Sequence, residues 1–557
     1  MTVARFRSAA AAAAAVAAAA CLMALSIGCV SPSRVEKKAP LFDDLGDHHF
    51  AVTTSVPLAQ RYFDQGLTLS YAFNHAEAAR SFREAARHDP GCAMAWWGVA
   101  LVLGPNINAP MDAGAVPESY AAVRKALELA PKASEKERAL IEALSKRYGP
   151  EPGADRKALD VAYAEAMRGV ARRFPGDDDV LTLLAESLMD LHPWDYWRKD
   201  GTAQPWTAEF VKTLESVLAR SPGHPGANHL YIHAVEASPD PDRAIPAAER
   251  LGPFAPGAGH LVHMPSHIWI RVGRYHDGTV ANQNAKAADD SYITQCRAQG
   301  LYPLAYRPHN VHFLWACATM EGRSELAMKA ACETSMMADE KAMREPGFGA
   351  LQHYRTVLYH SYVRFGRWDD ILSEQPPGAD LLYPTAVWHY ARGIAHAALG
   401  DFAKAEAERK KVAAIMADPK VEAVKIWDHN PAKTVLEIAH ETLSAEILAR
   451  SGKIDGALPH FRKAIEIEDS LIYQEPPDWY PPVRPMMGAA LLSAGRPRDA
   501  EKAYREDLER HRENGWSLYG LMQSLRDQGR LDEAREMDAR FRRAWAHADV
   551  TLTASRF

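Results

Sequence analysis

The chain has 557 residues, of which 47% are hydrophobic and 24% are charged, and its formal net charge at pH 7 is −6. These proportions are ordinary for a soluble globular protein, and the length allows several domains or one long repeat array. Because the sequence has no basic excess with which to neutralise phosphates, we exclude a general nucleic-acid binder.

The N-terminus is predicted to be a secretory signal of the lipoprotein kind. Arg5 and Arg7 form a short positive region, an apolar alanine-rich run covers 8–28, and Gly28 precedes Cys29. This order is typical of an export signal, and the Gly28–Cys29 junction resembles a bacterial lipoprotein cleavage site. We therefore expect a cell-envelope lipoprotein that faces the periplasm and reaches the membrane through a lipid on Cys29. A plain cleaved signal or an uncleaved anchor is the alternative.

A repeat of about 34 residues follows, and the segment 59–90 contains its cleanest copy. Small and aromatic residues stand where two antiparallel helices touch, and a proline follows the second helix. These residues are Gly66, Ala78, Phe82, Ala85 and Pro90, at repeat positions 8, 20, 24, 27 and 32. The pattern is that of a tetratricopeptide repeat (TPR).

Later copies of the repeat have glycine and proline at the same helix boundaries, with longer inserts between them. Glycine marks the turn between the helices of a pair at Gly273, Gly322, Gly366, Gly400, Gly452, Gly495 and Gly529, and proline closes second helices at Pro131, Pro175, Pro222 and Pro256. Strand signals are nearly absent. The sequence thus predicts an all-α, TPR-type helical-repeat solenoid of about nine or ten helix pairs.

The expected organisation has five parts. They are a signal peptide (1–29), an N-terminal arm (30–56), N-terminal TPR repeats (57–222), His-rich central TPR repeats with a metal site (223–375) and C-terminal TPR repeats (376–557).

Several motifs are more specific than the repeat. They are Leu45–Phe50 (LGDHHF), Ala95–Gly98 (AWWG), Gly259–His267 (GHLVHMPSH), Glu475–Tyr480 (EPPDWY) with Pro482–Arg484 (PVR), and Asn514–Leu518 (NGWSL). With them the chain resembles a family of bacterial and fungal TPR-repeat proteins and lipoproteins. The resemblance implies the fold and an envelope location, and it implies no activity.

Histidine is unusually frequent in the central repeats. Aligned on the glycine turns, nine histidines and one glutamate use only positions 2, 5, 9 and 12 of the first helix of a pair, which span about 80° at 100° per residue. They are His229, His233, Glu236, His260, His263, His267, His309, His312, His353 and His360. In TPR proteins this stripe is expected to line the concave groove.

Such a stripe favours a metal site. Neutral imidazole is the commonest metal-binding side chain, and sites rich in histidine suit copper, zinc, iron or nickel. We predict the nine histidines as ligands of two or more ions, with copper the first choice and zinc or iron next. Glu236 is predicted to be either a bridging ligand or a catalytic base for a metal-bound water. A groove that binds an acidic peptide through protonated histidines is the alternative.

Other histidines fit this pattern less well. His48 and His49 are second candidates, since the arm that carries them can fold over the site. His389 and His396 fall at positions that face a neighbouring helix, so we expect them in the core.

The predicted function is that of a metal-dependent enzyme, redox or hydrolytic, acting on a small molecule. Two alternatives remain open: a TPR scaffold for a protein or peptide partner in the cell envelope, and a metal-binding protein without catalysis.

Overall fold

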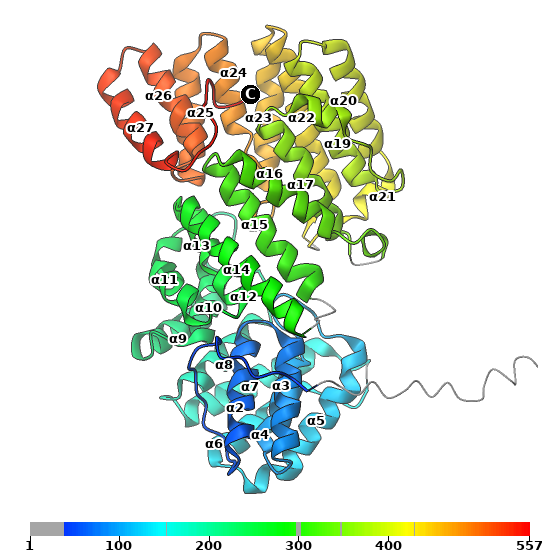
Figure 1. The fold of residues 1–557 in the computed structure, drawn as a ribbon, viewed down its shortest axis with the longest axis vertical. Helices are drawn as coiled ribbons and strands as arrows, with labels where there is room; N and C mark the ends of the chain where they lie inside the picture. Colours follow the sequence, from blue (N-terminus) through cyan, green and yellow to red (C-terminus); the bar gives the residue numbers. More distant parts are fainter. Residues whose placement is uncertain (1–37, 152, 297–301, 346–347, 428) are drawn as a thin grey trace, which may run out of the picture. The chain divides into compact units, whose positions relative to one another are not determined.

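The computed structural model describes residues 38–557 except 152, 297–301, 346–347 and 428 (Figure 1). The predicted signal peptide, including Cys29, and residues 30–37 of the predicted arm lie outside the described residues. Pro40–Phe557 form one compact unit, and it contains the helices that Figure 1 labels.

This unit is built from helix pairs that follow one another along the chain, and each helix packs against the next. The first helices are α2 (Pro57–Tyr71), α3 (His75–His88), α4 (Ala93–Val102), α5 (Val116–Leu129), α6 (Glu135–Leu144), α7 (Arg156–Arg173), α8 (Asp178–Met189) and α9 (Thr207–Arg220). The central ones are α10 (Pro225–Val235), α11 (Ile245–Phe254), α12 (Gly259–His263), α13 (Pro265–Val272), α14 (Tyr275–Cys296), α15 (Arg307–Met320), α16 (Ser324–Met337), α17 (Ala350–Arg364) and α18 (Trp368–Ser373).

The C-terminal helices continue the same arrangement. They are α19 (Leu382–Ala398), α20 (Phe402–Met416), α21 (Pro419–Glu422), α22 (Ala432–Arg450), α23 (Ile454–Ser470), α24 (Arg484–Ser493), α25 (Pro497–Arg510), α26 (Gly515–Asp527) and α27 (Leu531–Ala544). Short 3-10 helices cover Ala113–Ala115, Ala130–Lys132, Ser145–Arg147, Pro241–Ala244 and Ala342–Arg344, and a π-helix covers Tyr302–Tyr306. Strands β1 (Lys425–Ile426) and β2 (Asn430–Pro431) form one antiparallel pair.

The glycines and aromatic residues that mark the repeats in the sequence have a direct structural cause. Gly273 ends α13 with φ of 81° and Gly322 follows α15 with φ of 73°, a left-handed backbone that glycine adopts at little cost. The other glycines predicted at inter-helix turns also have positive φ. Gly66 and Phe82 are in contact, because a Cβ on Gly66 would lie 2.7 Å from the Phe82 ring.

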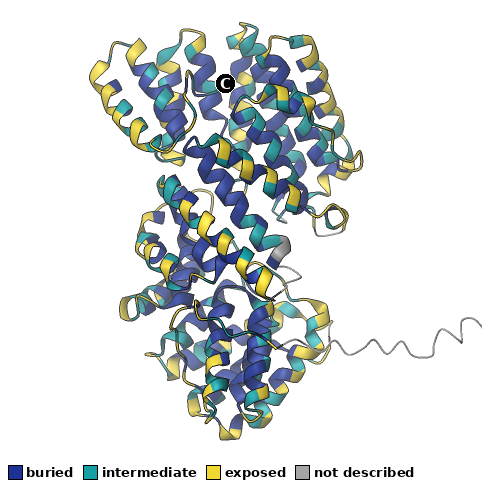
Figure 2. Ribbon diagram, in the orientation of Figure 1, coloured by how far each residue is buried: buried dark blue, intermediate teal, exposed yellow. Residues whose placement is uncertain are grey.

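Each helix buries the face that meets its neighbours. In α3 the buried positions include Ala78, Phe82 and Ala85, whose spacing of three to four residues places them on one face. Burial of a side chain such as Phe82 stabilises the fold by about 1.5–3 kcal/mol. Figure 2 shows exposed residues on the outer helix surfaces and buried residues where helices meet. The all-α, TPR-type solenoid predicted from the sequence is therefore confirmed.

One contact between segments that are distant in the sequence brings the first helix next to the histidine-rich helices. Besides its neighbours in sequence, α2 also packs against α10, so the end of the first helix lies beside the first histidine helix. No helix among the described residues combines the length and the apolar character needed to cross a membrane.

Candidate metal centre

Two groups of three imidazoles lie next to each other where α10, α12, α13 and α15 meet. The first group, called site 1, consists of His229, His233 and His260, and the second, site 2, consists of His263, His267 and His309. Within each group the nitrogen atoms that can bind an ion lie within 4.8 Å of one another. The structure thus brings together six of the nine predicted histidine ligands.

These imidazoles are enclosed rather than exposed in an open groove. His229, His233 and His260 are at most 2% exposed, and His263 and His267 at most 3%. His309 is intermediate in exposure. The sequence predicted that these imidazoles line the concave groove of the solenoid, and in the structure five of the six are buried.

Aromatic rings cover the two sites. The Phe73 ring lies 4.5 Å from that of His229 and 5.6 Å from that of His260, and the Trp194 ring lies 5.1 Å from that of His233. Phe73 and Trp194 have φ of 53° and 63°, a strained backbone for such residues that often marks a functional site. The Phe313 ring covers site 2 in the same way.

The proton positions in site 1 leave lone pairs that face each other. Nδ1 of His229 lies 2.5 Å from the Tyr71 carbonyl oxygen, and since a carbonyl can only accept, Nδ1 carries the proton and Nε2 a lone pair. Nδ1 of His233 donates in the same way to Glu236 at 3.3 Å. Nε2 of His229, Nε2 of His233 and both ring nitrogens of His260 are buried without a hydrogen-bond partner among the described residues. Buried polar atoms are rarely unpaired, and a bound cation would satisfy these.

In site 2 two imidazole nitrogens are paired with each other. Asn282 uses its amide nitrogen to donate to the Gly278 carbonyl at 2.7 Å, so its oxygen faces His263 and accepts from Nδ1 at 2.7 Å. Nε2 of His263 therefore carries a lone pair and lies 3.0 Å from Nε2 of His267. Two nitrogens bound to one zinc ion at 2.0–2.1 Å would be about 3.3 Å apart. A cation between these atoms, either a proton or a metal ion, fits the observed distance.

Glu236 lies between the two sites. This buried carboxylate at the end of α10 is 3.3 Å from Nδ1 of His233 and 2.6 Å from Nδ1 of His267. Metal-binding histidines commonly donate their other ring nitrogen to a carboxylate. The structure thus suits Glu236 to orienting one histidine of each site. Glu236 also forms, with His233 and His267, a further group whose possible ligand atoms lie within 4.8 Å of one another, so the bridging ligand or catalytic base predicted from the sequence stays a prediction.

The protonation states of the histidines in the two sites are determined by their burial and by the Glu236 carboxylate. Burial lowers the pKa of His229, His260, His263 and His309 well below the ordinary value, so these rings are neutral and able to bind metal. Burial acts in the same sense on His267, but Glu236 and Glu475 outweigh it and raise its pKa to about 9. Burial also opposes ionisation of Glu236, yet His267 and His233 lower its pKa to about 2.

Glu475 is a site residue that the sequence did not predict. It belongs to the EPPDWY motif between α23 and α24, and its side chain is 3% exposed with one oxygen 3.2 Å from Nδ1 of His267. Burial raises the pKa of this carboxyl to about 8. The motif was the only sequence signal, because no spacing rule connects Glu475 with histidines about 200 residues earlier.

The other three predicted ligands lie elsewhere. His312 and His353 are neighbours, with ring centroids 5.6 Å apart, and His353 bonds to the Tyr383 hydroxyl at 2.9 Å. His360 packs against the Trp479 ring. All three are buried, but none belongs to a metal-capable group of the described residues.

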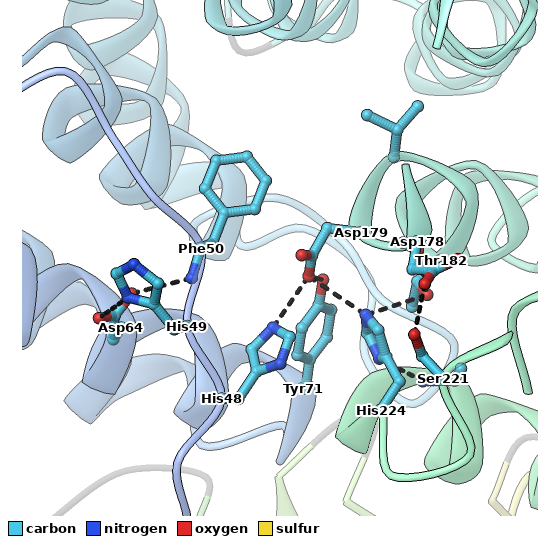
Figure 3. Close-up of polar contacts among 12 residues, drawn as sticks. His48, His49, Phe50, Asp64, Tyr71, Asp178, Asp179, Thr182, Ser221 and His224 are labelled. Atoms are coloured by element: carbon cyan, nitrogen blue, oxygen red, sulfur yellow. Dashed lines mark hydrogen bonds and ion pairs between the residues drawn. The ribbon is translucent and has the colours of Figure 1, made fainter. Parts of the chain in front are cut away.

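A third group of suitable atoms lies beside α8 and contains a second-candidate histidine (Figure 3). One oxygen of Asp179 accepts from Nε2 of His48 at 2.9 Å, from Nε2 of His224 at 3.2 Å and from the Tyr71 hydroxyl at 2.8 Å. Nδ1 of His224 accepts from the Ala227 amide, so its proton is on Nε2, where a metal would bind. This group is therefore held by hydrogen bonds and attaches the arm to the solenoid.

The remaining histidines singled out in the sequence have ordinary partners. His49 bonds to Asp64 at 2.8 Å and its side chain is 60% exposed. His389 bonds to Glu408 at 2.5 Å, and His396 is buried.

Comparison with known proteins gives only fold-level likeness. No family model matches the chain, and no curated protein matches it. Among solved structures, a human IFIT1 dimer with m7Gppp-AAAA is similar at 11% identity, with 88% of this chain and 91% of that chain covered and a TM-score of 0.31. Yeast Tom70 is similar at 9% identity, with coverages of 86% and 96% and a TM-score of 0.28. The function is therefore argued from the residues of this chain.

Proposed function

We propose that this protein binds two transition-metal ions, one at each of sites 1 and 2, and uses them on a small molecule. The observation that carries the proposal is the set of buried imidazole nitrogens without partners that face one another in site 1. Leaving such atoms unpaired costs roughly 1–3 kcal/mol each, and nothing in helix packing requires them.

The donor set indicates the kind of metal. Three imidazoles in each site, with a carboxylate behind them, suit copper, zinc or iron. Copper remains our first choice, because it binds nitrogen sites most tightly among divalent first-row ions. Such an ion supplies Lewis-acid chemistry, or redox chemistry if it is copper or iron, and the partly exposed His309 side is where a small substrate would approach.

The experiment is metal analysis of the full-length protein purified without a histidine tag. We expect about two equivalents of one metal per chain, and a double variant His263→Gln/His267→Gln should lose about one of them. The matched control is His312→Gln/His353→Gln, which alters two equally buried, adjacent imidazoles outside both sites. Wild-type protein that neither contains nor takes up copper, zinc or iron would refute the proposal.

A scaffold for a protein or peptide partner is the alternative function. Stacked helix pairs present the extended surfaces that such scaffolds use, and the confirmed fold supports it. It predicts partner binding that does not depend on either double variant.

Export to the cell envelope and a lipid anchor on Cys29 remain proposals that rest on the sequence alone. Lipid labelling of the wild-type chain, compared with Cys29→Ala, tests them.

A further inference from the structure

A second polar feature, separate from sites 1 and 2, lies between α17, α22 and the C-terminal segment. A cavity of about 30 Å³ is present there, lined on one side by Arg364, Arg450 and Arg556. The rest of its wall contains His360 and Tyr390 together with apolar side chains such as Trp368 and Met486. A cavity of this size holds about two water molecules or one small ion.

Arg364 is the unusual member of this wall. It is 5% exposed, and its Nε and Nη2 atoms are buried without a hydrogen-bond partner among the described residues. Its guanidinium carbon lies 3.7 Å from the centre of the Trp516 ring, a favourable contact that leaves the N–H groups unpaired. An uncompensated buried charge is strongly destabilising, so a partner is expected.

The neighbouring groups do not provide that partner. The buried Glu446 carboxylate pairs with Arg450 and Arg556 through its two oxygens. Asp507 is occupied by Ser517, Asn514 and His511. Arg450 also donates to the main-chain oxygen of Phe557, which lines the cavity too. Of the three guanidinium groups, Arg364 is thus the one that no carboxylate pairs with among the described residues.

We propose that this cavity binds a small monovalent anion, of the size of chloride or of a single carboxylate group. The anion would accept from Arg364 and balance the excess positive charge, while the apolar wall favours a weakly hydrated ion. Sulfate and phosphate are too large and too highly charged for the space.

The test is an anion titration of the full-length protein, with melting temperature as the readout. Protein in gluconate is titrated with chloride, formate or sulfate at constant pH and ionic strength. We expect a saturable rise of about 1–3 °C with chloride or formate and none with sulfate. The relative response to chloride and formate tells an inorganic ion from a carboxylate ligand.

Arg364→Met should abolish this response and should melt higher than the wild type in gluconate, because the unpaired charge is gone. Arg355→Met is the matched control: Arg355 is on the same helix but bonds to Ser335, and this variant should keep the response. If Arg364→Met does not fold, chloride-35 line broadening on the wild type, reversed by formate, replaces it. An equal response in both variants, or a wild type that responds to no anion and gives no broadening, would overturn the proposal.

Discussion

The backbone carbonyl of Tyr71 accepts a hydrogen bond from Nδ1 of His229, which lies 158 residues later in the chain. This single bond fixes the proton on Nδ1 of His229 and directs its Nε2 lone pair at His233 and His260. It exists because the end of α2 packs against α10. The first helix of the array therefore orients an imidazole of a site whose three histidines all lie in the central repeats.

His229→Gln is expected to remove the ion of site 1 and to leave that of site 2. The ligand nitrogen is lost, while His263, His267 and His309 are unchanged. Metal analysis should show a loss of about one equivalent per chain. His312→Gln serves as the control and should retain both ions; loss of both in His229→Gln would mean that the sites are not independent.

Asn282→Leu should weaken site 2 without touching a ligand. Asn282 accepts from Nδ1 of His263, so its removal frees the ring to rotate and to move its proton. Loss of such a partner typically lowers metal affinity about 10–100-fold. Competition with a chelator measures the effect, and an unchanged affinity would contradict the assignment of Nε2 as the ligand atom.

Asp179→Asn is expected to loosen the N-terminal arm. One oxygen of Asp179 accepts three hydrogen bonds, one of them from His48 of the arm. The change should destabilise this region by about 1–3 kcal/mol and increase protease cleavage within 40–56. Asp43→Asn is the control, because its pair with Arg61 is exposed and such pairs contribute about 0–1 kcal/mol.

Asp478 is expected to make stability depend on pH. The side chain is buried with one oxygen unpaired, and burial raises its pKa from 3.8 to about 7. The folded state therefore holds the proton more strongly than the unfolded state, so stability is lost as pH rises from about 4 to about 7.

Asp478→Asn should remove this loss. The amide oxygen can still accept from Asn430, which bonds to Asp478 at 2.7 Å. A shift of about three pKa units corresponds to about 4 kcal/mol as an upper bound. We expect a higher melting temperature than the wild type at pH 8 and little difference at pH 5. The exposed Asp455→Asn should change neither value, and a variant no more stable at pH 8 would contradict the argument.

Much of the fold was predictable because its signals are local. Gly66 and Phe82 are spaced in the sequence so that they meet where two helices pack. Glycine stands at the inter-helix turns because the backbone there has a positive φ. Pairs such as α4/α5 and α6/α7 lack this glycine turn and are joined by longer inserts, so their bounds were harder to place.

The site was predictable only within a helix and its neighbour. His229 and His233 are four residues apart on α10, and that spacing indicated one face. His353 and His360 lie on α17, a later helix. His312 shares α15 with His309, but its ring packs beside that of His353 and not in site 2. Phe73, Trp194 and Glu475 reach the centre through long-range packing, which repeat spacing does not encode.

The distance along the chain between Tyr71 and Glu475 has a consequence for biogenesis. Site 2 is not complete before Glu475, in the segment after α23, has been synthesised and has docked beside His267, although the six imidazoles are made much earlier. A nascent or truncated chain would present its histidines open to any cation at hand. We therefore expect correct metal binding only after the whole chain has been synthesised and folded. Retention of metal during dialysis would show that this folding is complete.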